Sequence, residues 1–280
     1  MAEHLRMRFF LILFLFAVAI CFSPSCNKMP NGGVPFYMRM DSATTTSASA
    51  GDNGIKDVWV EANSTNLGAY EMPCNYPVLE QNTVRFVVNA GIFESGQSGV
   101  RVIYPFYQPD TFSITATPTN QYVHHPVFKY KTGVSFPFTL QDFSFGSEFD
   151  GTNMSRVLDT TLNNYNWYGR ISTQIDSNKE AAQTNTYALP YDREVWLEFD
   201  YKAEVPFYVG FYGKYNAGNV VRYPVLFLTP RDTWIKMYLK LTDQINSVRA
   251  DNYNLFFEAL RPYGSTGGNV CIDNVRLVHY

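Results

Sequence analysis

The sequence predicts an all-β protein, and three observations support that class. Aromatic residues make up 16% of the 280 residues and charged residues only 17%, which is typical of pleated, half-buried sheets rather than of solvated helices. Apolar and polar residues alternate in many short runs, which glycine, proline and asparagine separate. Only the segment 242–252, TDQINSVRADN, is a candidate for a short helix.

The chain opens with a segment typical of a secretory signal. Arg6 and Arg8 precede an uncharged apolar run at 9–22, and small residues lead from there to Cys26. The run fits the roughly 7–15 residues of a signal sequence and falls short of the roughly 20 that span a bilayer. We therefore predict a signal peptide at 1–25.

Ser23-Pro24-Ser25-Cys26 resembles the lipobox of bacterial lipoproteins, although Ser23 and Pro24 depart from its usual residues. The resemblance implies that Cys26 is acylated, for example with palmitate, and becomes the first mature residue. Asn27 replaces the aspartate that favours inner-membrane retention in such proteins, which implies the outer membrane, in either leaflet. Each buried methylene contributes about 0.8 kcal/mol, so several acyl chains form a lasting anchor. The alternative is a secreted protein in which Cys26 is an ordinary thiol.

Residues 26–53 are predicted to form a flexible tether, because they are rich in small and turn-forming residues and lack periodicity. Alternation begins at 55–62 and returns at 84–90 and 111–117. Short strands separated by turn residues predict a small β-sandwich at 54–124.

Three phrases in this first sandwich carry a resemblance, at 55–60, 88–92 and 103–107. They resemble the prealbumin-like or immunoglobulin-like modules at the front of Bacteroidota-type surface lipoproteins. The resemblance implies a fold and a cell-surface context, and it implies no catalytic residue.

A second β region is predicted at 125–280. One-sided strands are clearest at 194–202 and 233–241, where apolar residues occupy every second position. The last strand changes phase, so we expect a bulge or a change of sheet near Asp273-Asn274. Residues 271–277 resemble the closing strand of jelly-roll carbohydrate-binding modules and galactose-binding-like domains, which implies a jelly-roll-like β-sandwich.

Two cysteines lie in the body of the protein, Cys74 and Cys271. A disulfide between them is permitted in an oxidising compartment. Because they lie near opposite ends of the mature chain, we favour two separate thiols.

Enzyme motifs are absent from the sequence, which contains no G-x-S-x-G, H-E-x-x-H, C-x-x-C or P-loop pattern. His124 and His125 are neighbours on a strand and therefore point to opposite faces, so they cannot chelate one metal. Glu194, Glu198 and Asp200 share a strand face at a spacing that glycoside hydrolysis allows. An ordinary polar face beside exposed lysines explains these carboxylates more simply.

Jelly-roll modules of the type that the chain resembles often hold a structural calcium ion near their first and last strands. Calcium requires hard oxygen ligands, and acidic residues occur at those places. The candidate calcium ligands are Asp142, Glu148, Asp150 and Asp273. The alternative for Asp273 is a role in capping the bulge.

Sugar recognition uses aromatic faces with amide and charged partners, presented from a rigid scaffold. The segment 163–170 combines these residue types, and outward aromatics on later strands extend the set. The candidate ligand-binding residues are Asn166, Trp167, Tyr168, Arg170, Trp196, Tyr208, Tyr212 and Tyr215. The alternative is that these aromatics cover a sheet edge or fill a domain interface.

The net charge of −3 and the lack of any basic block argue against a nucleic-acid partner. The leading hypothesis is a lipid-anchored cell-envelope protein with a non-catalytic module that binds glycan or another extracellular ligand. A structural subunit of an envelope adhesion, secretion or motility complex, with envelope proteins as partners, is the alternative. A glycoside hydrolase comes third.

Overall fold

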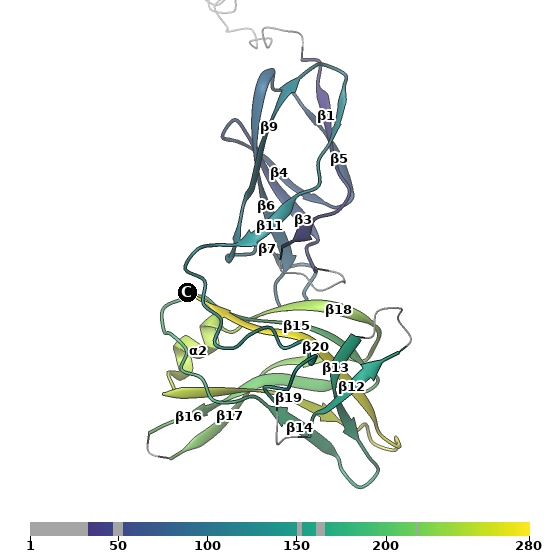
Figure 1. Cartoon of the computed structure of the whole chain (residues 1–280), viewed down its shortest axis with the longest axis vertical. Helices are drawn as coiled ribbons and strands as arrows, with labels where there is room; N and C mark the ends of the chain where they lie inside the picture. The colour runs from purple at the N-terminus through teal and green to yellow at the C-terminus, as the bar shows by residue number, and fades with distance from the viewer. Residues whose placement is uncertain (1–32, 47–52, 150–152, 161–165, 217) are drawn as a thin grey trace, which may run out of the picture.

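The computed structural model describes residues 33–46, 53–149, 153–160, 166–216 and 218–280, and shows two β lobes stacked end to end (Figure 1). Within these ranges every regular element is a strand except α2 (Thr242–Val248). The all-β prediction is confirmed, and α2 lies in the segment predicted as a short helix. The predicted signal peptide at 1–25 and Cys26 lie outside the described residues.

The N-terminal lobe is a sandwich whose core is shared by facing sheets. One sheet has the order β4-β3-β6-β7, with β9 also paired to β6, and the sheets β10-β1-β5 and β2-β11-β8 complete the lobe. Its strands are β1 (Phe36–Met40), β2 (Thr44–Thr45), β3 (Asp57–Ala62), β4 (Thr65–Glu71), β5 (Cys74–Val78), β6 (Asn82–Phe93), β7 (Arg101–Ile103), β8 (Tyr107–Gln108), β9 (Asp110–Ala116), β10 (Gln121–Val123) and β11 (Val127–Tyr130).

The predicted tether at 26–53 is wrong over β1 and β2. Phe36, Met38 and Met40 are buried in the core, whereas Tyr37 and Arg39 between them are exposed. This alternation is that of a half-buried strand, and β1 pairs with both β5 and β10. The alternation of apolar and polar residues in β1 is short, and it follows directly on glycine and proline residues that are typical of a linker.

The predicted boundary between residues 124 and 125 is also wrong. Strand β11 follows that point, yet it pairs with β2 and β8 of the N-terminal lobe. Phe128 on β11 is fully buried in the core of that lobe. The N-terminal lobe therefore extends to Tyr130, because β11 closes it.

The C-terminal lobe is a sandwich of two antiparallel sheets, of five strands (β12-β13-β20-β15-β18) and four strands (β14-β19-β16-β17). Inward side chains of both sheets form one core, which includes Phe199, Phe211 and Phe257. The strands are β12 (Ser155–Asp159), β13 (Asn166–Thr173), β14 (Lys179–Gln183), β15 (Val195–Ala203), β16 (Phe207–Lys214), β17 (Val220–Leu228), β18 (Arg231–Lys240), β19 (Asn252–Leu260) and β20 (Gly268–His279).

The bulge predicted in β20 is present. The register of β20 against β15 shifts between the pairs Glu198–Arg276 and Asp200–Asp273. Asn274 lies at this step with a φ of 50°, in the left-handed region that asparagine tolerates. The bulge keeps the apolar residues on both sides of it directed into the core.

The N-terminal lobe sits on the outer face of the five-stranded sheet (Figure 1). Trp196, Tyr238 and Val278 of that sheet belong to the core of the N-terminal lobe. The four-stranded sheet lies on the far side of the molecule, and no described element covers its outer face (Figure 1).

Cys74 and Cys271 are both free thiols, as predicted. Burial raises the pKa of each thiol, which keeps them protonated and unreactive. In the part of the chain that the structure describes, no helix has the length and apolar character needed to cross a membrane.

Candidate functional site

The predicted ligand-binding residues do not form one site. Tyr208 and Tyr212 lie on the outer face of the four-stranded sheet, whereas Asn166, Tyr168 and Arg170 lie on β13 at the opposite side of the sandwich. The remaining three residues, Trp167, Trp196 and Tyr215, have packing roles.

Trp196 fills the junction between the lobes and is 2% exposed. Its ring meets Tyr104 of the N-terminal lobe edge to face, with ring centroids 5.5 Å apart, and its Nε1 donates to Glu194 at 2.6 Å. The prediction that Trp196 contacts a ligand is wrong, because the strand face on which it lies is covered by the other lobe.

Trp167 and Tyr215 also have packing contacts. Trp167 packs against the C-terminal core, and the Arg156 guanidinium stacks on its ring at 4.6 Å. Tyr215 packs against the same core and shares a hydrogen bond with Tyr223, O to O 2.9 Å. Both rings are partly buried against the core, so packing accounts for them as well as ligand contact does.

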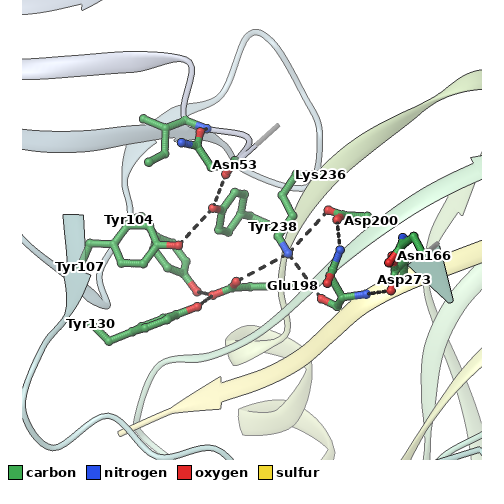
Figure 2. Close-up of polar contacts among 12 residues, drawn as sticks. Asn53, Tyr104, Tyr107, Tyr130, Asn166, Glu198, Asp200, Lys236, Tyr238 and Asp273 are labelled. Carbon is green, nitrogen blue, oxygen red and sulfur yellow. Dashed lines mark hydrogen bonds and ion pairs between the residues drawn. The ribbon is translucent and has the colours of Figure 1, made fainter. Parts of the chain in front are cut away.

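A polar network also occupies the junction (Figure 2). Glu198 accepts hydrogen bonds from the hydroxyls of Tyr104 at 2.5 Å and Tyr130 at 2.7 Å. Burial raises the pKa of Tyr104 well above its usual value, so this hydroxyl stays protonated and donates. The Lys236 ammonium lies 3.9 Å from Glu198 and 3.6 Å from Asp200.

These groups are buried rather than solvated: the side chains of Glu198 and Lys236 are 3% and 11% exposed. The interpretation of Glu198 and Asp200 as an ordinary polar face beside exposed lysines is therefore wrong. The N-terminal lobe removes Glu198 from solvent, and the network joins the lobes.

Asp273 lies beside this network, as the cross-strand partner of Asp200. It accepts hydrogen bonds from Asn166 Nδ2 at 2.8 Å and from the Asn274 backbone at 2.7 Å (Figure 2). Burial is the main cause that raises the pKa of Asp273, to about 7, and the nearby acids Asp200 and Asp142 add to it. Near neutral pH this carboxyl therefore holds a proton in part of the molecules.

The three predicted calcium ligands with described positions, Asp142, Glu148 and Asp273, do not form a metal-binding group. Asp142 accepts from the Ser144 backbone at 3.0 Å, and Glu148 accepts from Tyr187 and Asn185. Among the residues with described positions, no group of three or more acidic, histidine or cysteine side chains is arranged to hold a metal. Asp150 lies outside the described residues, so calcium binding stays a prediction.

The outer face of the four-stranded sheet, here called the open face, gathers aromatic and charged side chains. Tyr208 pairs across strands with Phe227 and with Glu258, and Tyr212 pairs with Arg222. The rings of Tyr208 and Phe227 lie 5.1 Å apart. Phe227 is 48% exposed, so this ring pair presents apolar surface to solvent.

Arg222 is held at the centre of the open face. Its guanidinium carbon lies 5.5 Å from the Tyr208 ring centroid and 4.8 Å from that of Phe256. Its Nη2 donates to Glu258 at 2.6 Å, and the Lys179 ammonium lies 3.8 Å from the same carboxylate. The rings and the ion pair together fix the plane of the guanidinium.

Gly210 lies between Tyr208 and Tyr212 along β16, and its lack of a side chain makes room for neighbouring groups. A Cβ at this position would lie 2.2 Å from the Tyr223 carbonyl oxygen and 2.8 Å from the Phe256 ring. No side chain therefore fits there, and the fully buried Phe256 ring underlies the gap between the two tyrosines.

Sequence reasoning found Tyr208 and Tyr212 through their alternation, but it missed Arg222, Phe227 and Glu258. The strand containing Arg222 and Phe227 is interrupted by Pro224 and by a register shift opposite Val209 and Gly210. Nothing in the sequence says which residues of β17 and β19 share a face with β16, because that depends on strand pairing.

No family model matches the chain, and no curated protein matches its sequence. About half of the chain is similar to solved structures of low sequence identity. A family 30 carbohydrate-binding module is 20% identical, over 52% of this chain and 88% of that chain, with a TM-score of 0.38. The family 11 carbohydrate-binding module of the cellulosomal cellulase Lic26A-Cel5E of Clostridium thermocellum is 17% identical, over 52% of this chain and 95% of that chain, with a TM-score of 0.35.

The enzymatically active domain of tailspike protein 4 of bacteriophage CBA120 is also similar. It is 14% identical, with a TM-score of 0.36, over 53% of this chain and 20% of that chain. The match therefore spans about a fifth of the tailspike domain.

Proposed function

We propose that the protein binds glycan, without catalysis, on the open face of its C-terminal lobe. The observation that carries the proposal is the pair of rings formed by Tyr208, which is partly exposed, and Phe227, which is exposed, beside the Arg222–Glu258 ion pair, in which only Glu258 is buried. Aromatic faces stack on the apolar patches of sugar rings, and charged groups fixed beside them orient the hydroxyls and other substituents of the sugar.

The ion pair supports recognition rather than folding. The Glu258 side chain is 6% exposed, and removing a carboxylate from water costs several kcal/mol, which the partner charge repays only in part. A buried ion pair is therefore weak evidence for stability. No described element covers this sheet face, so a fixed pair of charges beside the rings is available to form hydrogen bonds with a bound ligand.

The test is binding to a panel of soluble polysaccharides by affinity electrophoresis, followed by calorimetry on any that bind. Tyr208→Ala and Phe227→Ala are each expected to weaken binding about 3- to 10-fold, because each removes one stacking ring. Tyr263→Ala is the matched control, since Tyr263 is fully exposed in the loop after β19. A double variant that binds every polysaccharide as tightly as the unchanged protein contradicts the proposal.

The proposal includes a lipid anchor at Cys26 and an outer-membrane location. The described chain starts at Gly33, at the end of the N-terminal lobe that lies far from the open face (Figure 1). An anchor on that side leaves the open face directed away from the membrane. Metabolic labelling with a clickable fatty acid tests this, because label that persists in Cys26→Ala refutes the anchor.

A further inference from the structure

The charges on the open face are unequal. Three cations, Lys179, Lys214 and Arg222, are directed to this face with one carboxylate, Glu258. Lys214 donates a hydrogen bond to the Thr186 hydroxyl at 2.8 Å, and it has no ion pair with any residue of the described ranges. The whole chain carries a net charge of −3, so this local excess of positive charge runs against the overall balance.

Two other acids on these strands and loops have asparagine partners. Glu180 accepts from Asn153 at 2.6 Å, and Asp251 accepts from the backbone and side chain of Asn216 at 2.7 and 3.0 Å. Within the described ranges, the only ion pairs of Lys179 and Arg222 are those with Glu258. One carboxylate therefore faces two cations at the centre of the open face.

The Arg222 side chain is 32% exposed, so a ligand can reach its guanidinium from the open face. Its Nη2 donates to Glu258, and its Nε, which meets no hydrogen-bond acceptor among the described residues, is buried and therefore not a donor for a ligand. A guanidinium held flat against rings suits a planar carboxylate better than a neutral hydroxyl.

Building on the proposed function, we infer that the open face selects an acidic glycan, in which a sugar carboxylate lies against Arg222 and Lys179. The sugar ring that bears it stacks on Tyr208 and Phe227. Glu258 fixes the guanidinium and limits the positive charge. A sulfate ester presents the same negative charge with different geometry, so the experiment separates the two sources of charge.

The experiment compares polymers that differ in charge. The full-length chain is titrated with polygalacturonate, with its methyl-esterified form, which keeps the same backbone without the charge, and with a sulfated galactan, which carries sulfate esters on a galactose backbone. Charge-assisted hydrogen bonds are stronger than neutral ones by an amount that corresponds to about tenfold in affinity. We expect polygalacturonate to bind at least about tenfold more tightly than the ester, and more tightly than the sulfated polymer.

Two variants report on the charges directly. Lys179→Gln, at an exposed side chain, is expected to weaken polygalacturonate binding up to about fivefold without affecting the fold. Glu258→Gln is expected to strengthen it by a similar factor, because it removes the one carboxylate that repels the ligand. Lys129→Gln, at an exposed lysine of β11, is the matched control and is expected to change nothing.

Each outcome decides between the proposals. Equal binding of acid and ester, or binding of neutral polymers alone, overturns the acidic preference and leaves the glycan proposal standing. Preference for the sulfated polymer overturns the carboxylate assignment. Polygalacturonate binding that survives in Tyr208→Ala/Phe227→Ala is non-specific and overturns both proposals, as does failure to bind any polymer. Loss of the preference in Lys179→Gln but not in Lys129→Gln supports it.

Discussion

Asp273 is a buried carboxyl group whose cross-strand neighbour is another acid. It is 3% exposed and lies directly across from Asp200 on the neighbouring strand. Burial, with a smaller effect of Asp200 and Asp142, raises its pKa from 3.8 to about 7, against the opposing effect of hydrogen bonds from Asn166 and Asn274. Lys236, the nearest cation of the network, contacts Asp200 rather than Asp273. The folded state therefore prefers the protonated carboxyl.

The sign of the resulting pH dependence follows from proton counts. Between pH 4 and pH 7 the folded state holds a proton that the unfolded state has released, so stability falls as the pH rises through this window. A rise in the pKa from 3.8 to about 7 corresponds to on the order of 4 kcal/mol. Asp273→Asn is expected to match the unchanged protein near pH 4 and to be more stable at pH 8.

Urea unfolding at both pH values measures this difference. Asp232→Asn, at an exposed position of β18, is the control for loss of one surface carboxylate and is expected to shift stability by less than about 0.5 kcal/mol. If the difference between Asp273→Asn and the unchanged protein does not depend on pH, the protonation assignment is wrong.

At the scale of elements, β1 shows how two adjacent side chains have unequal roles. Met38 is fully buried in the N-terminal core, and Arg39 beside it is exposed. Met38→Ala is expected to destabilise the protein by about 2–5 kcal/mol, because it leaves a cavity in the core. Arg39→Ala is expected to cost no more than about 1 kcal/mol, since its ion pair with Asp41 is solvated. Equal effects in denaturant unfolding would falsify the assignment of β1 as a core strand.

The elements that could be predicted from the sequence are those in which apolar and polar residues alternate over a long, uninterrupted run. The strands at 194–202 and 233–241, the short helix and the bulge at Asn274 are all present. Strand β1 was missed because it has only five residues and follows a glycine- and proline-rich stretch. Strand β11 was assigned to the wrong lobe because a local pattern carries no information about its partners, β2 and β8.

The candidate site was predictable only where one strand defines it. Tyr208 and Tyr212 alternate outward on a single strand, so their shared face follows from the period. Arg222 and Glu258 come from two further strands, and only the registers of β16 with both neighbours bring them together. The alternation correctly predicted that Trp196 and Glu198 point away from the core of the C-terminal lobe. It could not predict that the N-terminal lobe packs on this face and buries both side chains.

At the scale of the whole molecule, the two lobes share one contact region rather than being joined by a linker alone. Tyr104 is fully buried and contacts Trp196 and Tyr238 of the other lobe, with ring centroids 5.5 Å and 4.7 Å away. The Tyr238 hydroxyl donates to the Asn53 carbonyl at 2.6 Å, which adds a polar tie (Figure 2). Aromatic contacts with satisfied hydroxyls favour a fixed orientation of the lobes.

This coupling predicts that the lobes unfold together. Because the aromatic and polar contacts of the junction are lost when either lobe unfolds, calorimetry on the unchanged protein is expected to show a single transition. Trp196→Ala removes the largest side chain of the junction, at a cost of about 3–5 kcal/mol. It also frees space around Tyr104, so it is expected to separate the scan into two transitions.

The matched control is Phe227→Ala, which removes an aromatic ring from the open face on the far side of the C-terminal lobe. It is expected to lower the transition temperature slightly and to leave one transition, because Phe227 is half-exposed and outside the junction. Two transitions in the unchanged protein would show that the lobes fold independently, and the distance between anchor and open face would then depend on the linker rather than on the junction. One transition in Trp196→Ala would show that the coupling of the lobes does not depend on Trp196.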